Sequence, residues 1–358
     1  MPFVHEQAAS RVVFGTGALE SVAGEVERLG SARVLLICDR HSRPYGDAVA
    51  AALGGRLAGR IGETATHVPA PLARAAAERA AECDADLLVS VGGGSATGLA
   101  KAVALHRRPE RRLRILAVPT TYAGSEMTPV WGVTEDGRKR TGRDPAAQPV
   151  TVVYDPALTV ALPPGLSAAS GMNALAHLIE AGYAPGVSPL VAAASAEGAG
   201  LLARALPEVA ADPTGLAARE DALRGAWLAG WALGVAPMGL HHEICHVLGG
   251  AYGLPHAATH SAVLPYVAAY NRRAAPGPLG RIAAALGADD AAAGLWDLRT
   301  TVGAPADLAG LGLPESAIDR VAALVVAAAP RNPRPAGLDA VRGILRAAYD
   351  GRPVPAPD

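Results

Sequence analysis

Residues Asp86–His106 read DLLVSVGGGSATGLAKAVALH, which joins a short apolar run to a glycine turn and then to an alanine-rich run. The first six residues, Asp86–Val91, have the length and composition of a buried strand, and Ala96–His106 have those of a helix. Three glycines in a row let the backbone approach a diphosphate closely, and the amides that begin the helix favour its negative charge. The triple glycine is not the GxGxxG fingerprint, so a tight structural turn is the alternative. We therefore predict phosphate binding at Gly92, Gly93, Gly94 and Ser95.

Two further apolar runs, Arg33–Cys38 and Arg114–Val118, predict strands that alternate with helical segments in the first half of the chain. This alternation is typical of a parallel sheet covered by helices. Asp39 follows the first run, where an acidic residue either binds an adenosine ribose or simply forms a turn. Arg40 and Arg43 nearby suit a ribose phosphate, so both NADH and NADPH are open.

The turn after Arg114–Val118 is rich in hydroxyl groups, in the sequence PTTYAGSE. Ligands of open α/β sheets bind at the carboxyl ends of the strands, which is where this turn lies. We therefore expect Thr120, Thr121 and Ser125 to contact the cofactor.

A cationic segment, Gly137–Asp144 (GRKRTGRD), follows between turn residues. One interpretation is a solvated loop, and the other is a site for an anionic substrate. Its four cations are Arg138, Lys139, Arg140 and Arg143.

The segment Leu162–Gly165 (LPPG) is the best candidate for a domain boundary, which predicts domains at 1–162 and 163–358. The second domain is expected to be helical throughout. Its expected helices run from Ser167 or Ser170 to Tyr183 and over 189–206, 216–236, 238–249, 262–273, 279–286, 291–302, 315–329 and 338–349.

Five of the ten histidines lie in Met238–His260, MGLHHEICHVLGGAYGLPHAATH. His242 and His246 stand four apart and so share one helix face, while His256 follows a Gly-Leu-Pro turn. Asn173 and His177 repeat the four-residue spacing in a distant helix. Imidazoles ligate metals, relay protons or donate hydrogen bonds, and ordinary core or surface histidines are the alternative.

The overall composition excludes several classes of function. A net charge of −1 at pH 7 and the lack of a long basic run argue against nucleic acid. Neither a signal peptide nor a membrane-spanning run is recognisable, and three scattered cysteines fit a reduced cytoplasmic protein. Cys245, beside His246, is more readily explained as a buried structural thiol than as a nucleophile.

Five motifs, taken in order, resemble the iron-containing alcohol dehydrogenase superfamily, and within it the maleylacetate reductases. The resemblance implies a dehydroquinate synthase-like fold, with an α/β nucleotide-binding domain built on a parallel sheet followed by an all-α domain. It also implies NAD(P)H in the cleft between the domains and a homodimer. The motifs are GGGSATGLAK (92–101), PTTYAGSEMTPVWG (119–132), SGMNALAHLIEA (170–181), LHHEICHVLGG (240–250) and LPHAATH (254–260).

In metal-dependent members of this family, the positions of Asn173, His177, His242 and His256 hold the ion. Here the first position is an amide, which offers a divalent cation no Coulombic attraction. Gly98 also stands where the family usually has Asp. Both departures are shared by the maleylacetate reductase pattern, so we expect these four positions to be vestigial and metal not to be required.

The implied activity is reduction of the carbon-carbon double bond of maleylacetate, a dicarboxylate enone, to 3-oxoadipate in the degradation of aromatic compounds. Under this hypothesis His177, His242 and His256 stabilise the enolate oxygen and His246 donates the proton, while Asn173 occupies the lost ligand position. The substrate carboxylates need cations, for which Arg331 and Arg334 are candidates beside the four of Gly137–Asp144. Three alternatives are a metal-dependent alcohol or aldehyde oxidoreductase, a biosynthetic reductase, and a non-catalytic nucleotide-binding protein.

Overall fold

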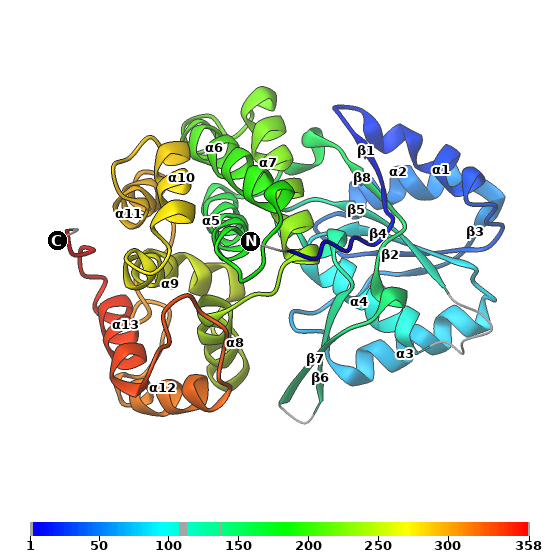
Figure 1. Cartoon of the computed structure of the whole chain (residues 1–358). Helices are drawn as coiled ribbons and strands as arrows, with labels where there is room; N and C mark the ends of the chain where they lie inside the picture. Colours follow the sequence, from blue (N-terminus) through cyan, green and yellow to red (C-terminus); the bar gives the residue numbers. More distant parts are fainter. Residues whose placement is uncertain (1–2, 107–112, 136–137, 357–358) are drawn as a thin grey trace. The chain divides into compact units, whose positions relative to one another are not determined.

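The computed structural model describes residues 3–106, 113–135 and 138–356, without the side chains of Arg138 and Lys139. The chain divides into two compact units (Figure 1). One is Gln7–Leu162, and the other combines Met1–Glu6 with Pro163–Asp358. Each unit is described by itself.

The first unit is built on a six-stranded sheet in which every pairing is parallel. The parallel sheet and the three strands expected at 33–38, 86–91 and 114–118 are confirmed. The strand order is β1-β8-β5-β4-β2-β3. The strands are β1 (Arg11–Phe14), β2 (Val34–Cys38), β3 (Leu57–Ile61), β4 (Leu87–Gly92), β5 (Arg114–Pro119) and β8 (Thr151–Tyr154).

Helices cover both faces of this sheet because side chains alternate along each buried strand. On β2, Leu35 and Ile37 pack with helices α3 and α4, whereas Leu36 and Cys38 pack with α1 and α2. The helices are α1 (Val22–Arg28), α2 (Arg43–Leu53), α3 (Ala70–Glu82) and α4 (Gly94–Leu105), with short 3₁₀ turns at Ala18–Ser21, Gly54–Arg56, Ser125–Met127, Pro145–Ala147 and Pro156–Thr159.

The sheet reverses its winding direction between β2 and β4. From β2 the chain moves outward to the edge strand β3, and then it returns to β4 and continues through β5 to β8 on the other side. The carboxyl ends of β2 and β4 flank this switch point, where open α/β sheets bind ligands. The fold therefore places Asp39 and the glycine turn next to each other, after the carboxyl ends of neighbouring strands.

The cationic segment is a strand, so its interpretation as a loop was wrong. Val130–Glu135 (β6) and Arg138–Arg143 (β7) pair as an antiparallel hairpin. The ring of Trp131 lies over Gly142 so closely that a Cβ there would come within 2.7 Å of it. Strand β7 is stabilised by this contact and by its pairing with β6. A run of cations in the sequence predicts neither interaction.

The second unit is helical, as predicted. Helix α5 (Pro164–Gly182) lies at its centre: every residue from Ser167 to Gly182 is buried, and α6, α7 and α9 pack on it. Among the described residues, none of the helices has both the length and the apolarity that a membrane span needs. The others are α6 (Pro189–Ala211), α7 (Leu216–Val235), α8 (Leu240–Tyr252), α9 (His256–Asn271), α10 (Pro276–Leu286), α11 (Ala291–Thr301), α12 (Ile318–Ala327) and α13 (Leu338–Asp350), with a 3₁₀ turn at Glu315–Ala317.

Three helices begin earlier than the sequence pattern predicts, and one of them is α10, which starts at Pro276. Helix α5 starts at Pro164 and α9 starts at His256, directly after Pro255. Proline is well suited to the start of a helix, because its φ is already helical and its missing N–H is not needed there. His256 therefore lies on a helix rather than in the preceding turn.

Candidate active site

One face of helix α5 carries three polar side chains into the centre of the helical unit. Asn173, His177 and Glu180 follow one another at spacings of four and three residues, which places them in line on a helix. All three are buried, with side chains at most 3% exposed. Their apolar neighbours on α5 fix the helix on every other side, so the polar face is held rigidly.

Glu180 organises the start of helix α8. Its Oε1 accepts from the main-chain N–H of His241 at 2.8 Å, and its Oε2 accepts from those of Gly239 at 3.0 Å and His242 at 3.2 Å. The same Oε2 lies 2.5 Å from Nδ1 of His242, and the Tyr183 hydroxyl donates to Oε1 at 3.3 Å. A carboxylate thus satisfies amides that the first turn of a helix leaves without partners.

These hydrogen bonds decide the charge of Glu180 and the tautomer of His242. Burial alone would raise the pKa of Glu180, but the hydrogen bond and charge of His242 and the donated amides lower it to about 2. An ionised carboxylate only accepts, so Nδ1 of His242 carries a hydrogen. Neutral His242 consequently presents a lone pair at Nε2, and that atom donates only when the ring is protonated.

Six imidazoles from three helices lie in contact around this anchor. The ring centres of His177 and His242 are 5.1 Å apart and stacked, and that of His260 is 4.8 Å from His242 and 4.4 Å from His256. His241 lies 4.8 Å from His260, and His246 lies 6.4 Å from His256 in a stacked arrangement. The structure therefore brings together all four histidines that the sequence singled out, and adds His241 and His260.

The cluster runs from the core to the surface. His177, His241, His242 and His260 are buried, His256 is half-buried and His246 is exposed. Burial lowers the pKa of His177 and His260 well below the usual value, and it lowers the pKa of His241 to about 3. Five buried atoms of this cluster have no hydrogen-bond partner: Asn173 Oδ1, His177 Nδ1, His241 Nδ1, His242 Nε2 and His260 Nε2.

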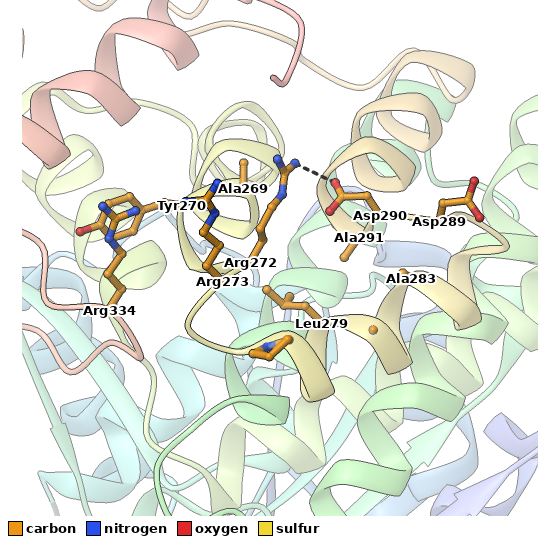
Figure 2. Close-up of a pocket in the computed structure, with 12 residues that line it drawn as sticks. Ala269, Tyr270, Arg272, Arg273, Leu279, Ala283, Asp289, Asp290, Ala291 and Arg334 are labelled. Carbon is orange, nitrogen blue, oxygen red and sulfur yellow. Dashed lines mark hydrogen bonds and ion pairs between the residues drawn. The ribbon is translucent and has the colours of Figure 1, made fainter. Parts of the chain in front are cut away.

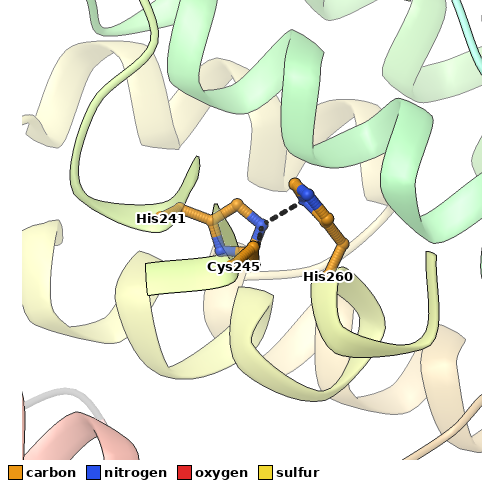
Figure 3. A group of neighbouring side chains, drawn as sticks. All are labelled: His241, Cys245 and His260. Carbon is orange, nitrogen blue, oxygen red and sulfur yellow. Dashed lines mark hydrogen bonds between the residues drawn. The ribbon is translucent and has the colours of Figure 1, made fainter. Parts of the chain in front are cut away.

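The family's iron is not well matched by these residues. Within the described part of the chain, only one group of three His, Cys, Asp or Glu side chains has its ligand atoms within 4.8 Å of one another, and it is His241, Cys245 and His260 (Figure 3). The set His177, His242 and His256 does not meet this criterion. The amide at Asn173 also gives a divalent ion no negative charge at the position where metal-dependent members carry a carboxylate.

Cys245 is fully buried one turn after His241. Burial, with the negative charge of Glu180, raises the pKa of its thiol well above the usual value. A protonated, enclosed thiol is a poor nucleophile, which favours the structural interpretation.

Two of the three glycines in the turn of the first unit, Gly92 and Gly93, are packed too tightly for side chains. A Cβ at Gly92 would lie 2.9 Å from Cβ of Ala96, and one at Gly93 would lie 2.9 Å from Cγ2 of Thr121. Gly92 has a φ of +148°, which other residues rarely adopt. A Cβ at Gly94 would meet only Ala123, at 3.6 Å. The turn therefore exposes main-chain amides at the start of α4, as a diphosphate requires.

The predicted cofactor residues surround this turn. Oδ1 of Asp39 accepts from the amides of His41 at 2.9 Å and Ser42 at 2.8 Å, so Asp39 does form a turn. Its other oxygen would lie 3.2 Å from a Cβ at Gly92. The amide of Thr120 donates to the carbonyl of Gly92 at 3.2 Å, and Thr121 packs against Gly93. A ribose hydroxyl can still use the second oxygen of Asp39, so the two interpretations of this residue are compatible.

Lys101, a buried lysine to which the sequence analysis gave no role, fixes the loop that carries Ser125. Nζ of Lys101 donates to the carbonyl oxygens of Ser125 at 2.6 Å, Thr128 at 2.8 Å and Val130 at 2.7 Å. Burial lowers its pKa to about 7, although the neighbouring Glu126 opposes that shift. The loop that carries Ser125 is thereby fixed to helix α4.

The candidate cations for the substrate belong to both units. Arg140 and Arg143 are exposed on β7, where Arg140 lies 3.6 Å from Glu135, while the side chains of Arg138 and Lys139 lie outside the described residues. In the helical unit, the guanidinium of Arg334 lies 4.4 Å over the ring of Tyr270. Arg334 also lines a pocket of about 500 Å³ near the end of α9 (Figure 2), at the opposite end of that helix from His256.

The backbone of Arg331 lies beside the start of helix α8. Its carbonyl oxygen leaves no room for a Cβ at Gly239, the residue that precedes α8 and donates to Glu180. Arg331 is exposed. Its main chain therefore lies beside the first turn of the helix that carries His241 and His242.

Sequence reasoning missed Glu180, His241, His260 and Lys101. A signal for Glu180 exists, since it stands three residues after His177 on the same helix face. His241 and His260 belong to the dense histidine segment, but neither fits the spacing of the family's ligands. The lysine has no local signal, because its partners lie 24 to 29 residues away.

Comparison with known proteins agrees with this architecture. Residues 9–156 match the family "Iron-containing alcohol dehydrogenase", and residues 167–349 match "Fe-containing alcohol dehydrogenase family, C-terminal". The chain is 46% identical over 349 residues to a maleylacetate reductase of Burkholderia cepacia, with 98% of each chain covered. The crystal structure of maleylacetate reductase from Agrobacterium tumefaciens is similar at a TM-score of 0.94 and 42% identity, covering 99% of both chains.

A more distant solved structure contains a cofactor. Sulfoacetaldehyde reductase from Bifidobacterium kashiwanohense, in complex with NAD⁺, is similar at a TM-score of 0.87 and 25% identity, covering 97% of this chain and 99% of that one.

Proposed function

Because this chain belongs to the iron-containing alcohol dehydrogenase family, we propose that it is an oxidoreductase that reduces the carbon-carbon double bond of maleylacetate to 3-oxoadipate. The similarity to maleylacetate reductases extends over almost the whole chain and therefore includes both units. The observation that supports this most directly is the buried imidazole cluster with an amide at Asn173, where metal-dependent relatives carry a carboxylate. We place the reaction in the degradation of aromatic compounds.

The proposed reaction is a conjugate reduction. Bound NADH or NADPH supplies a hydride to the alkene carbon that is β to the ketone. The electron pair of the double bond moves toward the ketone, whose oxygen becomes an enolate, and a proton is then added to the α carbon. The balance is one enone, one reduced cofactor and one proton giving the saturated ketone and the oxidised cofactor.

The residues have separate tasks in this proposal. Hydrogen-bond donors near the ketone stabilise the enolate, each contributing on the order of 3 kcal/mol to the transition state. His177 and His256 are assigned to this task with His242, which must be protonated to donate because Nδ1 is bound to Glu180. His246 is exposed, and so it can exchange its proton with solvent and act as the proton donor.

We further propose that catalysis does not require a metal. Conjugation with the alkene already delocalises the charge, so a Lewis acid is not needed at the oxygen. The amide at Asn173, which offers a cation no negative charge, supports this proposal.

The cofactor is assigned to the carboxyl edge of the sheet. Gly92, Gly93, Gly94 and Ser95 would hold the diphosphate, and Thr120, Thr121 and Ser125 would line the neighbouring turn. Asp39 favours NADH through its free oxygen, while Arg40 suits NADPH, so both cofactors should be measured. The family resemblance also supports a homodimer, which sedimentation of the purified protein tests.

The deciding experiment measures oxidation of NADH and NADPH with maleylacetate, before and after exhaustive chelation and after addition of zinc or ferrous iron. We expect rapid turnover that chelation does not change. Turnover only with added metal would refute metal independence. Turnover of simple alcohols or aldehydes, without turnover of maleylacetate, would refute the substrate and leave a metal-dependent alcohol oxidoreductase.

A further inference from the structure

Two buried histidines that the proposed roles do not use form a direct pair. Nε2 of His241, on helix α8, lies 2.9 Å from Nδ1 of His260, on helix α9. Both residues are 0% exposed. Figure 3 shows this contact together with Cys245, whose Sγ lies 3.8 Å from the same nitrogen of His241. Because both rings are neutral, one of the two nitrogens carries the hydrogen and the other accepts it.

His260 links this pair to the rest of the cluster. One of its nitrogens is used by His241, and the other, Nε2, is buried without a partner. The ring centre lies 4.8 Å from His242, 4.4 Å from His256 and 6.2 Å from His177. The unpaired edge of His260 therefore lies among the three imidazoles to which enolate stabilisation is assigned.

The direction of the hydrogen bond between His241 and His260 decides whether Nε2 of His260 carries a hydrogen or a lone pair. If Nε2 of His241 donates, Nδ1 of His260 accepts and Nε2 of His260 carries a hydrogen. Each arrangement leaves one buried N–H without a protein partner, at Nε2 of His260 in the first and at Nδ1 of His241 in the reverse, so the two differ in which ring offers a donor to a ligand. The first arrangement puts the unpaired N–H on His260, whose ring centre lies 4.8 Å from that of His242 and 4.4 Å from that of His256, two residues to which enolate stabilisation is assigned.

We propose that His260 is a further catalytic residue, which donates its Nε2–H to the ketone oxygen of the enone as that oxygen becomes an enolate. His241 is then a positioning residue, which holds His260 in the donating tautomer. This inference rests on the proposed function. It adds a donor that is neutral throughout the reaction, so no proton need be supplied before hydride transfer.

The same atoms suggest a competing role. His241, Cys245 and His260 form the group whose ligand atoms lie within 4.8 Å of one another, and thiolate and imidazole are ligands of zinc. A zinc ion there would require all three residues equally. The hydrogen-bond proposal requires the two histidines and not the thiol.

Substitutions at the three positions separate these roles. His260→Phe removes the donor at similar size and should lower kcat about 100-fold, while KM for maleylacetate changes less. His260→Gln restores an amide N–H close to the position of Nε2 and should recover part of the loss. His241→Phe should lower kcat roughly tenfold and His241→Gln should recover it. Cys245→Ala is the matched control, and its kcat should stay within about twofold of the wild type, as expected of a buried residue outside the donor chain.

Correctly folded His260→Phe protein with unchanged kcat would overturn the proposal. So would a Cys245→Ala protein that loses as much activity as the histidine variants, together with stoichiometric zinc in the wild type. Nitrogen-15 spectra of the imidazoles in the wild-type protein give a test that needs no turnover. Hydrogens on Nε2 of both His241 and His260 are expected, and a hydrogen on Nδ1 of His260 would refute the inference. Absence of maleylacetate turnover in the wild type would instead refute the proposed function, and the spectra would still decide the tautomer.

Discussion

Nδ1 of His242 lies 2.5 Å from the carboxylate of Glu180, which also accepts the main-chain amides that begin helix α8. One buried side chain thus fixes both the position of the helix and the tautomer of its first reactive imidazole. The stability of this start of α8 and the chemistry of His242 are therefore coupled. A change at Glu180 cannot affect one without the other.

Glu180→Gln should lower kcat roughly 10- to 100-fold, as is common when the partner that orients a reactive histidine is lost. All five groups that approach Glu180 are donors, so the NH₂ group of glutamine has no acceptor and the unfolding free energy should also fall. Steady-state kinetics and thermal unfolding measure the two effects.

Tyr183→Phe is the matched control, because it removes one donor to Glu180 and leaves His242 in place. It should cost about 1 kcal/mol of stability with little change in kcat. A folded Glu180→Gln protein with wild-type kcat would show that the tautomer of His242 is unimportant for turnover.

Asn173→Asp should give the site an affinity for metal that the wild type lacks. The new carboxylate is buried without a cation, so the metal-free variant should be less stable than the wild type. Added zinc or ferrous iron should restore its melting temperature and bind at least about tenfold more tightly than to the wild type, a difference of roughly 1.4 kcal/mol.

The same substitution should reduce turnover of maleylacetate, since a negative charge beside the developing enolate opposes its formation. Metal analysis after dialysis, with Asn173→Ala as the control, measures the binding. Equal metal content in all three proteins would mean that residue 173 does not determine metal binding.

Sequence alone was sufficient for the central strands because each is a continuous apolar run that ends at a turn. The edge strands β1 and β3 are short and partly exposed, and a polar or small residue interrupts each pattern. The hairpin β6-β7 was missed because its second strand is almost entirely cations and small residues. Edge strands depend on pairing with a neighbour that sequence does not identify.

In the site, likewise, sequence patterns predict residues that are related by local spacing but not contacts between separate elements. Asn173, His177, His242, His246 and His256 were found because their spacing repeats within one helix or matches a family pattern. The pair His241–His260 joins two helices over 19 residues, and Lys101 reaches a loop on another element. Such contacts arise only when the helices pack, so the residues' own neighbours in sequence carry no sign of them.

Gly94→Ala tests the cofactor site without disturbing the free protein. A Cβ at this position meets only Ala123 at an ordinary distance of 3.6 Å, so the melting temperature should hardly change. If the diphosphate of NADH lies against this turn, the added methyl group occupies part of its position. The Kd for NADH should then rise about tenfold or more, which is a loss of at least roughly 1.4 kcal/mol of binding free energy. Fluorescence titration with NADH measures this, and an unchanged Kd would place the cofactor elsewhere.

Arg331→Met should weaken recognition of the substrate carboxylates. The backbone of Arg331 packs against Gly239 at the start of α8, whereas the guanidinium of Arg334 is already engaged by the ring of Tyr270. Loss of a charge-assisted hydrogen bond costs about 1.5–3 kcal/mol, so KM for maleylacetate should rise roughly 10- to 150-fold with a smaller change in kcat. Arg334→Met is the matched control, since it removes a cation from the same segment, and its KM should stay close to that of the wild type. Equal effects of the two substitutions on KM would contradict this assignment. Arg140 and Arg143 on the hairpin would then be the remaining candidates for binding the carboxylates.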